Sequence, residues 1–329
     1  MKILVVNVNW LGDVLLSTAA LRALRKHYPT ARLACLVPPR CRDVLQGNPY
    51  IDEIIPDEGF WKTFWRVKKS GFDSAIFFHR SGSRKFLAFL AGIPARLGFQ
   101  STPRRNFFLT RTFTPPPDGT HRGDFFLELL SAMGVASDGR APDFFPSGEG
   151  AGELRKLLSA EGLQPSSPYA VMHPGGNWDL KRWPPRHFAE FAGLFLKAYP
   201  SMTLILCGTP PEKEIADEVL RQTASPRLIS LCGKTTLDIL AHLLKGARFL
   251  ISNDSGPIHL AASQKTPIVG IFGPTSAALT GPVSSGPVLI LSKDVGCQVP
   301  CYFKSCEGHQ CMEWLAPEEV FRKTQLWLK

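Results

Sequence analysis

The sequence predicts an α/β protein made of two doubly wound domains, each with a parallel sheet between layers of helices. Short runs of β-branched and apolar residues alternate with helical patterns along almost the whole chain. Such alternation produces parallel strands joined by right-handed crossovers. The length of 329 residues exceeds what one hydrophobic core usually serves, so two domains are expected.

The first half of the chain opens with Lys2–Asn7, a buried β-branched run, and a helix that begins at Gly12–Asp13 and ends near Tyr28. The same reasoning gives the remaining elements of this half. The further predicted strands are Arg32–Val37, Ile51–Ile55 and Ser74–Phe78, and the further predicted helices are Arg40–Gln46, Phe60–Ser70 and His121–Met133.

A Pro/Ser-rich stretch, Gly162–Pro168, follows a predicted helix over Gly150–Glu161 and marks the expected linker. We therefore expect a first domain over 1–165 and a second over 166–315, with a terminal helix over 316–329 that packs back on the first domain. The strands predicted for the second half are Tyr169–His173, Thr203–Cys207, Phe249–Asn253, Pro267–Phe272 and Val288–Leu291, and the helices are Pro185–Tyr199, Pro211–Ala224, Leu237–Lys245 and Pro317–Trp327. Doubly wound halves place the default ligand site in the cleft between them.

The formal net charge of +10 is unevenly placed, because no acidic residue lies between Asp73 and Asp118. The basic residues in that interval that we single out are Arg80, Arg84, Lys85, Arg104 and Arg105. They favour an anionic partner, such as a phosphorylated substrate or a lipid headgroup, over an ordinary solvated face. Nucleic acid is not expected, since no known binding module is recognisable. We find no signal peptide and no long apolar run, which predicts a cytoplasmic protein.

The turn Ser252–Ala262 joins a buried strand to a helix and carries Asp254, Ser255, Gly256 and His259. Ligands of open α/β sheets lie beyond such strand ends, and the unpaired amides and dipole of the helix favour an anion such as a diphosphate. Gly256 allows the backbone to approach that ligand closely. An ordinary capped turn is the alternative for this segment, and a packed core position is the alternative for the histidine.

A second loop, His173-Pro-Gly175-Gly176, is followed by Lys181-Arg182-Trp-Pro. Glycines at a strand end followed by two cations are suited to binding phosphate oxygens. The alternative is a surface loop with incidental charge, which has the same composition.

After the first strand, Asn9, Trp10 and Gly12 precede Asp13 at a helix N-terminus. With a single glycine this segment is not the dinucleotide-binding fingerprint. Asp13 is a candidate general base, with helix capping as the alternative.

Four cysteines, Cys297, Cys301, Cys306 and Cys311, lie close together near the C-terminus. They suggest zinc or a redox-active cluster, but their spacing lacks the paired knuckles of a structural zinc site. Reduced, unliganded thiols are the alternative, and we assign no metal to these cysteines.

In three blocks the chain resembles bacterial lipopolysaccharide heptosyltransferases of the ADP-heptose family, which have the GT-B fold of two Rossmann-like domains. These blocks are MKILVVNVNWLGDVLLSTAALRALR, HPGGNWDLKRWP and SNDSGPIHLAASQKTPIVGIFGPTS, and the cysteine-rich tail is similar to the heptosyltransferase II branch. The resemblance implies inverting transfer from ADP-L-glycero-D-manno-heptose to heptosyl-Kdo-lipid A, with ADP-heptose as donor substrate and no cofactor required.

The resemblance also implies roles for individual residues. Asp13 is implied as the general base, and Gly175, Gly176, Lys181, Asp254, Ser255, Gly256 and His259 as donor-binding residues. Asn9, Trp10, Gly12 and the five basic residues named above are expected to bind the acceptor. The loop Asn177–Leu180 departs from the family pattern, so its path is open.

The partners that follow are a nucleotide sugar, a phosphorylated Kdo-lipid A acceptor and the anionic inner face of the inner membrane, for a monomeric, peripheral protein. The rival functions are a GT-B transferase that uses another nucleotide sugar or acceptor, and a nucleotide-sugar epimerase.

Overall fold

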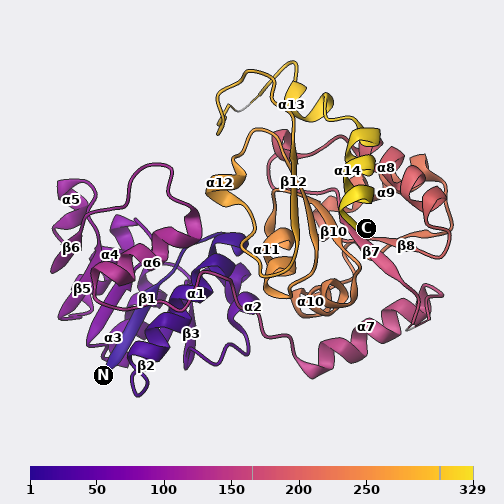
Figure 1. Ribbon diagram of the computed structural model, residues 1–329. Helices are drawn as coiled ribbons and strands as arrows, with labels where there is room; N and C mark the ends of the chain where they lie inside the picture. The colour runs from indigo at the N-terminus through magenta and orange to yellow at the C-terminus, as the bar shows by residue number, and fades with distance from the viewer. Residues whose placement is uncertain (165, 304, 329) are drawn as a thin grey trace. The chain divides into compact units, whose positions relative to one another are not determined.

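The computed structural model describes residues 1–164, 166–303 and 305–328 and divides the chain into two compact units, Met1–Phe145 and Pro146–Lys329 (Figure 1). The last residue predicted for the first domain, 165, and the last residue of the predicted terminal helix, 329, lie outside the described residues.

The first unit is built on a parallel sheet of six strands. Their order is β3 (Glu53–Pro56), β2 (Arg32–Val37), β1 (Lys2–Val6), β4 (Ser74–Phe77), β5 (Ala95–Phe99) and β6 (Arg111–Phe113). This is the doubly wound Rossmann order, with its switch point between β1 and β4.

Helices cover both faces of this sheet. They are α1 (Leu11–His27), η1 (Pro39–Cys41), α2 (Arg42–Leu45), α3 (Phe60–Ser70), α4 (Gly82–Leu90), α5 (Pro103–Asn106) and α6 (Arg122–Ala132). Helices α3 and α4 bury Phe64, Val67 and Leu87 against one face of the strands, and α1 and α6 pack on each other. The apolar stripes of α3 and α4 therefore face the sheet.

The second unit repeats the same topology. Its parallel strands run β12 (Val288–Ser292), β11 (Ile268–Phe272), β10 (Leu250–Asn253), β7 (Tyr169–His173), β8 (Thr203–Leu206) and β9 (Leu228–Ser230). Counted within the unit this is the same strand order, and the switch point lies between β7 and β10. The prediction of two doubly wound parallel domains is confirmed.

Helices also surround the second sheet. They are α7 (Gly148–Ala160), η2 (Asp179–Lys181), α8 (Pro185–Ala198), η3 (Pro210–Glu212), α9 (Lys213–Thr223), α10 (Leu237–Gly246), α11 (Gly256–Ser263), α12 (Ala277–Thr280), α13 (Gln310–Glu313) and α14 (Pro317–Leu328). The core under α8 includes Phe188, Phe191 and Phe195, together with the fully buried Trp183. On the other side Gly270 of β11 admits α11 closely, since a Cβ there would come 2.9 Å from Ile258.

The predicted domain boundary at 165/166 is too late, because α7 belongs to the second unit. Ser147, the N-cap of α7, donates from its amide and its hydroxyl to Asp238 at 2.6 and 2.7 Å. The helix also packs along α10. The N-cap of α7 is thus hydrogen-bonded within the second unit, and its apolar side packs there. The Pro/Ser-rich stretch is therefore a loop inside that unit.

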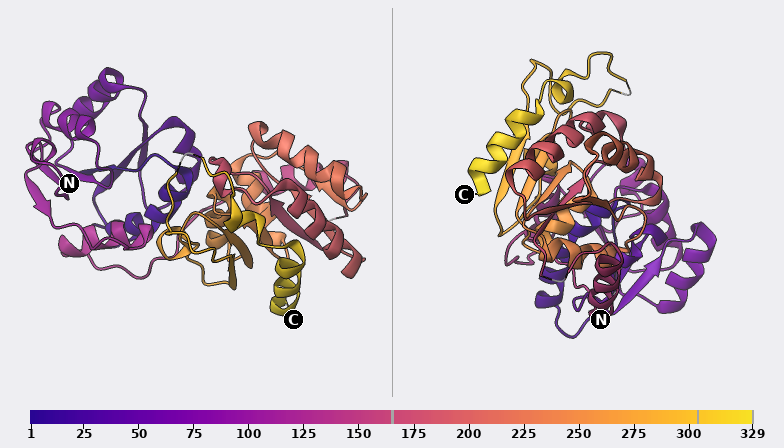
Figure 2. Two further views of the ribbon diagram at one scale, coloured as in Figure 1. Left: turned by 90° about the horizontal axis from the view of Figure 1, so that it is seen from above. Right: turned by 90° about the vertical axis from the view of Figure 1, so that its right-hand side faces the viewer.

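The C-terminal helix also differs from expectation. Helix α14 belongs to the second unit and packs on α8 and β12, as Figure 2 shows for the yellow helix. Val320 of α14 is fully buried in the core that Phe188 and Phe191 share. The apolar face of α14 is therefore covered without the first unit. None of the helices formed by the described residues has the length and apolar content needed to cross a bilayer.

Candidate active site

The two switch points gather the residues that the sequence singles out. In the second unit, the loop after β7 and the turn after β10 follow strands that pair directly. In the first unit, Asn9 to Asp13 follow β1, which pairs with β4. Ligands of open α/β sheets bind beyond the carboxyl ends of such strands, so each unit has one favoured site.

Asn253, at the end of β10, ties three segments of the second unit together. Its side-chain amide donates to the carbonyl oxygens of Pro174 and Gly175, both at 2.9 Å. Its side-chain oxygen accepts from the amide of Trp183 at 3.0 Å. The residue is fully buried, and a buried amide is costly unless it is paired in this way. The two predicted donor-binding blocks are therefore joined by one side chain.

His173, at the end of β7, continues this network. Its Nδ1 lies 3.0 Å from the hydroxyl of Ser255, and its Nε2 lies 3.4 Å from a carboxylate oxygen of Glu212. The imidazole of His173 therefore lies between the Ser255 hydroxyl and the Glu212 carboxylate. The chain from Glu212 through His173 holds Ser255 at the start of α11.

Glu212 is the acidic end of that chain and is largely buried. Burial on its own would raise the pKa of Glu212, but the hydrogen bond and charge of His173 and the amide and hydroxyl of Thr209 lower it to about 2. The carboxylate thus stays ionised. Gly175 leaves room for it, since a Cβ on Gly175 would lie 2.1 Å from its Oε1.

Lys181 and Asp254 form an ion pair in the second unit. The ammonium of Lys181 lies 2.9 Å from Oδ2 of Asp254, and the hydroxyl of Thr280 donates to the same oxygen at 3.3 Å. Only 5% of the Asp254 side chain is exposed, against 20% for Lys181. One flank of the lysine therefore remains open to a ligand while the other is neutralised.

Helix α11 begins at Gly256 beside this pair, with Ser255 as its N-cap. Among the described residues, no side chain caps α11 by a hydrogen bond to its amides. The hydroxyl of Ser255 instead contacts His173 and the carbonyl of Asn253. The positive end of the helix is thus adjacent to a lysine, the arrangement that favours an anion. His259 lies one turn further along α11 and is buried.

The remaining predicted donor residue, Gly176, accepts through its carbonyl from Nε of Arg182 at 2.8 Å. This hydrogen bond closes the loop over Asn177–Leu180, the part that departs from the family pattern. Arg182 also pairs with Asp179 at 2.7 Å. The second cation of the Lys-Arg pair therefore shapes the loop.

The cysteine-rich tail supports the same loop. His309 lies with its Nε2 2.7 Å from the carbonyl oxygen of Leu180, and the indole of Trp183 donates to the carbonyl of Leu315 at 2.9 Å. Within the described part of the chain, no group of three or more His, Cys, Asp or Glu side chains is arranged to hold a metal ion. The cysteines Cys297, Cys301, Cys306 and Cys311 are free thiols there.

Asp13 lies in the first turn of α1, three residues after the N-cap Trp10. Its side chain is 28% exposed, and one carboxylate oxygen lies 3.8 Å from Nε of Arg122. Gly12 occupies the same turn. A carboxylate in this position is favoured by the helix dipole and is open to solvent.

Asn9 and Trp10 form the approach to α1. The amide of Asn9 lies 3.0 Å from Nε2 of His79, and its carbonyl accepts from Arg40 at 2.8 and 3.1 Å. The same guanidinium lies 5.0 Å from the ring centre of Trp10, whose side chain is exposed. Asn9 is therefore fixed between the ends of β1 and β4.

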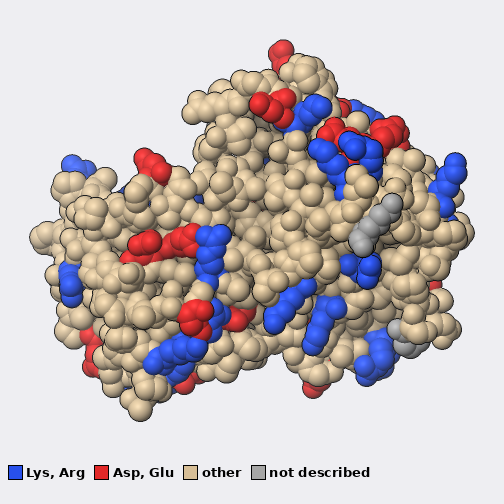
Figure 3. Space-filling view, in the orientation of Figure 1, with Lys and Arg blue, Asp and Glu red and all other residues tan. Residues whose placement is uncertain are grey.

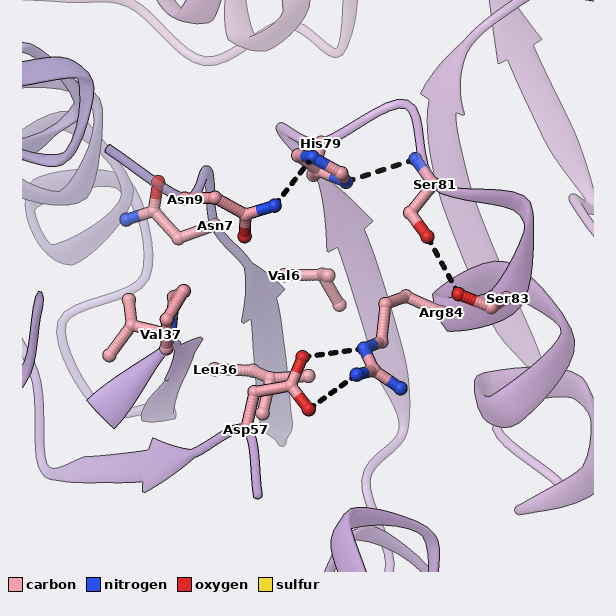
Figure 4. A pocket seen from close by; sticks show the side chains of 11 residues that line it. Val6, Asn7, Asn9, Leu36, Val37, Asp57, His79, Ser81, Ser83 and Arg84 are labelled. Atoms are coloured by element: carbon pink, nitrogen blue, oxygen red, sulfur yellow. Dashed lines mark hydrogen bonds and ion pairs between the residues drawn. The ribbon is translucent and has the colours of Figure 1, made fainter. Parts of the chain in front are cut away.

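A cavity of about 110 Å³ opens at the switch point of the first unit. Figure 4 shows Asn9, His79, Ser81 and Ser83 along one side, and the paired Asp57 and Arg84 along the other. Its lining is mostly polar side chains above the ends of the strands. It was not foreseen from the sequence, because its residues come from four separate segments.

The five predicted basic residues differ in their surroundings. Arg84 makes two hydrogen bonds to Asp57, at 2.6 and 2.5 Å. Lys85 is only 1% exposed, and burial, followed by repulsion from Arg105 and Arg80, lowers its pKa. Arg80, Arg104 and Arg105 stay exposed. On the face that Figure 3 shows, basic and acidic side chains are interspersed.

The model of glycosyltransferase family 9, the heptosyltransferases, matches residues 60–309. The chain belongs to this family. The match covers the loop after β7, the turn after β10 and the first three cysteines of the tail. The GT-B fold of the family is the fold described above.

Curated relatives of the family 9 chain are heptosyltransferases. Lipopolysaccharide heptosyltransferase 2 of Salmonella typhimurium is 27% identical over 301 residues, which covers 86% of each protein. Lipooligosaccharide heptosyltransferase 2 of Haemophilus ducreyi is 25% identical and covers 98% of each. Lipopolysaccharide heptosyltransferase 3 of Escherichia coli is 26% identical over 80% of each.

Solved structures agree with the fold. The E. coli ADP-heptose lipopolysaccharide heptosyltransferase II superposes with a TM-score of 0.83 at 25% identity, covering 100% of this chain and 98% of the other. A family 9 glycosyltransferase from Veillonella parvula gives a TM-score of 0.87 at 25% identity, covering 99% and 97%. The protein is thus a heptosyltransferase-family enzyme with the two-sheet architecture of its relatives.

Two residues of the network were missed by sequence reasoning. Glu212 is far from the motifs, and its only signal is the Thr209-x-x-Glu pattern of a capping box, which the structure forms. Asn253 lies inside the predicted turn, but only the parallel pairing of β7 and β10 reveals that it holds both loops.

Proposed function

We propose that the protein transfers L-glycero-D-manno-heptose from ADP-heptose to the inner core of lipopolysaccharide, with heptosyl-Kdo-lipid A as acceptor. The observation that carries the proposal is the pairing of Lys181 with Asp254 beside the uncapped start of α11. A cation next to a helix N-terminus is suited to a diphosphate. A relative of similar length is named as an ADP-heptose transferase, which supports the choice of donor.

In this proposal the second unit binds the donor. Lys181 and the first amides of α11 neutralise the diphosphate, while Asp254 orients the lysine and Ser255, Gly256 and His259 shape the surrounding surface. Gly175 and Gly176 allow the loop after β7 to approach the nucleotide. Stabilising the charge that develops on a departing group is commonly the largest contribution to such catalysis.

The first unit supplies the base and the acceptor site. Asp13 takes the proton of the acceptor hydroxyl, whose oxygen attacks the anomeric carbon from the face opposite the diphosphate. The bond between that carbon and the diphosphate oxygen breaks, and its electron pair leaves with ADP. The configuration inverts, as a single displacement through an oxocarbenium-like state requires. The proposed step needs no cofactor and no metal.

Acceptor phosphates are assigned to the exposed Arg80, Arg104 and Arg105, with Asn9 and Trp10 nearer to the base. Arg84 is assigned a positioning role through Asp57, and Lys85 is the buried member of the basic group. The acceptor is a lipid, so the proposal places the enzyme at the cytoplasmic face of the inner membrane as a peripheral protein.

The test is a panel of donors offered to the purified protein. ADP-heptose should be turned over, and UDP- and GDP-sugars should not. Transfer from a UDP- or GDP-sugar in preference to ADP-heptose would replace the donor assignment while leaving a GT-B transferase. Isomerisation of the sugar nucleotide without transfer would replace the reaction itself.

A further inference from the structure

The helices α3, α4 and α5 expose large apolar side chains to solvent. Six of them lie on or directly beside these helices, and we call them the aromatic face. They are Trp61 (67% exposed), Trp65 (62%), Phe86 (37%), Phe89 (42%), Leu90 (38%) and Phe107 (74%). Exposed apolar residues that occur singly are ordinary, whereas a contiguous group marks a surface for interaction.

Ring contacts show that the aromatic face is continuous. In α3 the rings of Trp61 and Phe60 have centroids 5.2 Å apart, and Phe60 stacks on Phe86 of α4 at 5.9 Å. Phe86 then contacts Phe108 at 5.1 Å, and Phe108 contacts Phe107 at 5.3 Å. One row of rings thus runs from α3 across α4 to the residues after α5.

The charged side chains on the three helices of the aromatic face are all basic. The three helices contain no Asp or Glu, while α3 contributes Lys62, Arg66, Lys68 and Lys69. The ammonium of Lys68 lies 5.6 Å from the ring centre of Trp65, and Arg104 and Arg105 of α5 are exposed. Glu58, before α3, contacts Lys62 at 3.4 Å. The surrounding surface is therefore complementary to a negatively charged partner.

Helix α3 has the composition of a helix that lies in a membrane interface. Phe64 and Val67 point into the core of the unit, and Trp61 and Trp65 occupy the outer side one turn apart. Tryptophan with flanking lysine is typical of the boundary between headgroups and acyl chains. A soluble acidic protein would meet the same charges, but exposed tryptophans surrounded by lysines match the layered chemistry of a lipid surface better.

We propose that the aromatic face docks the first unit on an anionic lipid bilayer, with Trp61 and Trp65 inserted among the headgroups and the lysines of α3 on the lipid phosphates. The inference names the surface by which the protein would bind the membrane. It rests on the membrane location in the proposed function and not on heptosyl transfer, because docking needs neither donor nor acceptor. Docking through this face would hold the enzyme in a defined orientation on the membrane that contains its lipid acceptor.

The test uses the full chain and vesicles of phosphatidylcholine with or without phosphatidylglycerol, in the absence of any sugar nucleotide. The wild type should sediment with the anionic vesicles and not with the neutral ones, and binding should weaken as salt rises. Trp61→Ala/Trp65→Ala should lower the affinity by about tenfold or more. Inorganic phosphate at millimolar levels should not displace the protein, which separates a bilayer from a free anion.

A matched control keeps the result interpretable. Trp314, in the second unit, is 55% exposed, and Trp314→Ala should bind vesicles as the wild type does. Both tryptophans of α3 are exposed, so melting temperatures of all variants should agree. Unchanged sedimentation of the α3 double variant would overturn the proposal, as would binding to neutral vesicles with equal affinity.

A second measurement separates docking from heptosyl transfer. If the proposal is correct, the double variant keeps the wild-type rate on an acceptor presented in detergent and loses rate only when the acceptor is embedded in vesicles. Equal loss in both settings would overturn the docking role. A wild type that binds anionic vesicles but transfers no heptose would leave docking intact and overturn the proposed function instead.

Discussion

The two units have the same strand order and the same switch point, yet they fill it differently. In the second unit the strand ends are closed by buried side chains: Asn253, His173 and Asp254 are all at most 4% exposed. In the first unit the equivalent place holds a cavity lined by Asn9, His79 and Ser81. A shared scaffold therefore supports one site closed by buried side chains, which the proposal assigns to the nucleotide, and one open site, which the proposal assigns to the acceptor.

The largest effect is expected from Asp13, at the start of α1 in the first unit. Asp13→Asn removes the proposed base but keeps the shape of the side chain, so turnover should fall by about 10²–10⁴-fold. The dissociation constant for ADP-heptose, measured by calorimetry, should stay within about twofold, because the donor network lies in the other unit. Asp43→Asn, in the first turn of α2, serves as the control. Wild-type turnover in Asp13→Asn would remove Asp13 from the role.

Changes in the proposed donor site of the second unit should alter the affinity for the nucleotide. Lys181→Met removes a charged hydrogen bond to the diphosphate, and the dissociation constant for ADP should rise by about 100-fold. Because Asp254 then loses its partner, the variant should also melt earlier, and Lys181→Met/Asp254→Asn should recover stability without recovering ADP affinity. An unchanged ADP affinity in Lys181→Met would contradict the assignment.

The hydrogen-bond network of the second unit should also affect the free energy of unfolding at low pH. The folded pKa of Glu212 is lowered from 4.5 to about 2, so its contribution to stability is present above pH 4.5 and is lost as the pH falls toward 2. The loss should be about 3 kcal/mol. Denaturant titrations of the wild type and Glu212→Gln should differ at pH 6 and converge near pH 2. Parallel curves at every pH would show that the carboxylate contributes nothing.

Charge reversal sharpens the division between the units. In Arg104→Glu/Arg105→Glu, the KM for a phosphorylated acceptor should rise by about tenfold, since two cations are lost. The dissociation constant for ADP-heptose should not change. Loss of donor binding in a folded variant would mean that the two sites are assigned to the wrong units.

The smallest effect concerns Lys85. Its pKa is lowered in the fold by burial and by Arg105 and Arg80, so the charged form opposes folding at neutral pH. Lys85→Met should therefore raise the free energy of unfolding by about 1 kcal/mol. The gain should shrink as the pH rises toward 10, where the lysine loses its proton. A destabilised Lys85→Met would indicate that the ammonium has a compensating partner.

Periodicity was sufficient to predict the strongly apolar strands, both parallel sheets and the positions of the two loops that follow β7 and β10. It failed for β5, which contains Arg96 and Gly98, and for β6, which is only three residues long. Such strands are defined by their pairing with a neighbour, which a local pattern does not record. The predicted domain boundary was wrong for a similar reason. Helix α7 belongs to the second unit because its N-cap, Ser147, donates to Asp238, and this contact between distant residues leaves no local pattern.

The candidate site residues also divide into those that a local pattern predicts and those that depend on distant contacts. Lys181 and Asp254 were singled out because each lies in a loop that follows a predicted strand, and the structure brings the two side chains together. The ion pair of Arg84 with Asp57 and the burial of Lys85 were not predicted, because both depend on contacts with residues distant in sequence. Net charge along the chain thus identified the basic segment but did not show which cations stay free for a ligand.

The most direct test of the proposed function is a transfer assay with pure protein, ADP-heptose and Kdo-lipid A, with and without its first heptose, read by mass spectrometry of the lipid. We predict that one heptose is added to the acceptor that already carries a heptose, and none to the acceptor that lacks it. Addition to bare Kdo-lipid A alone, or to neither acceptor while ADP-heptose still binds, would contradict the assignment.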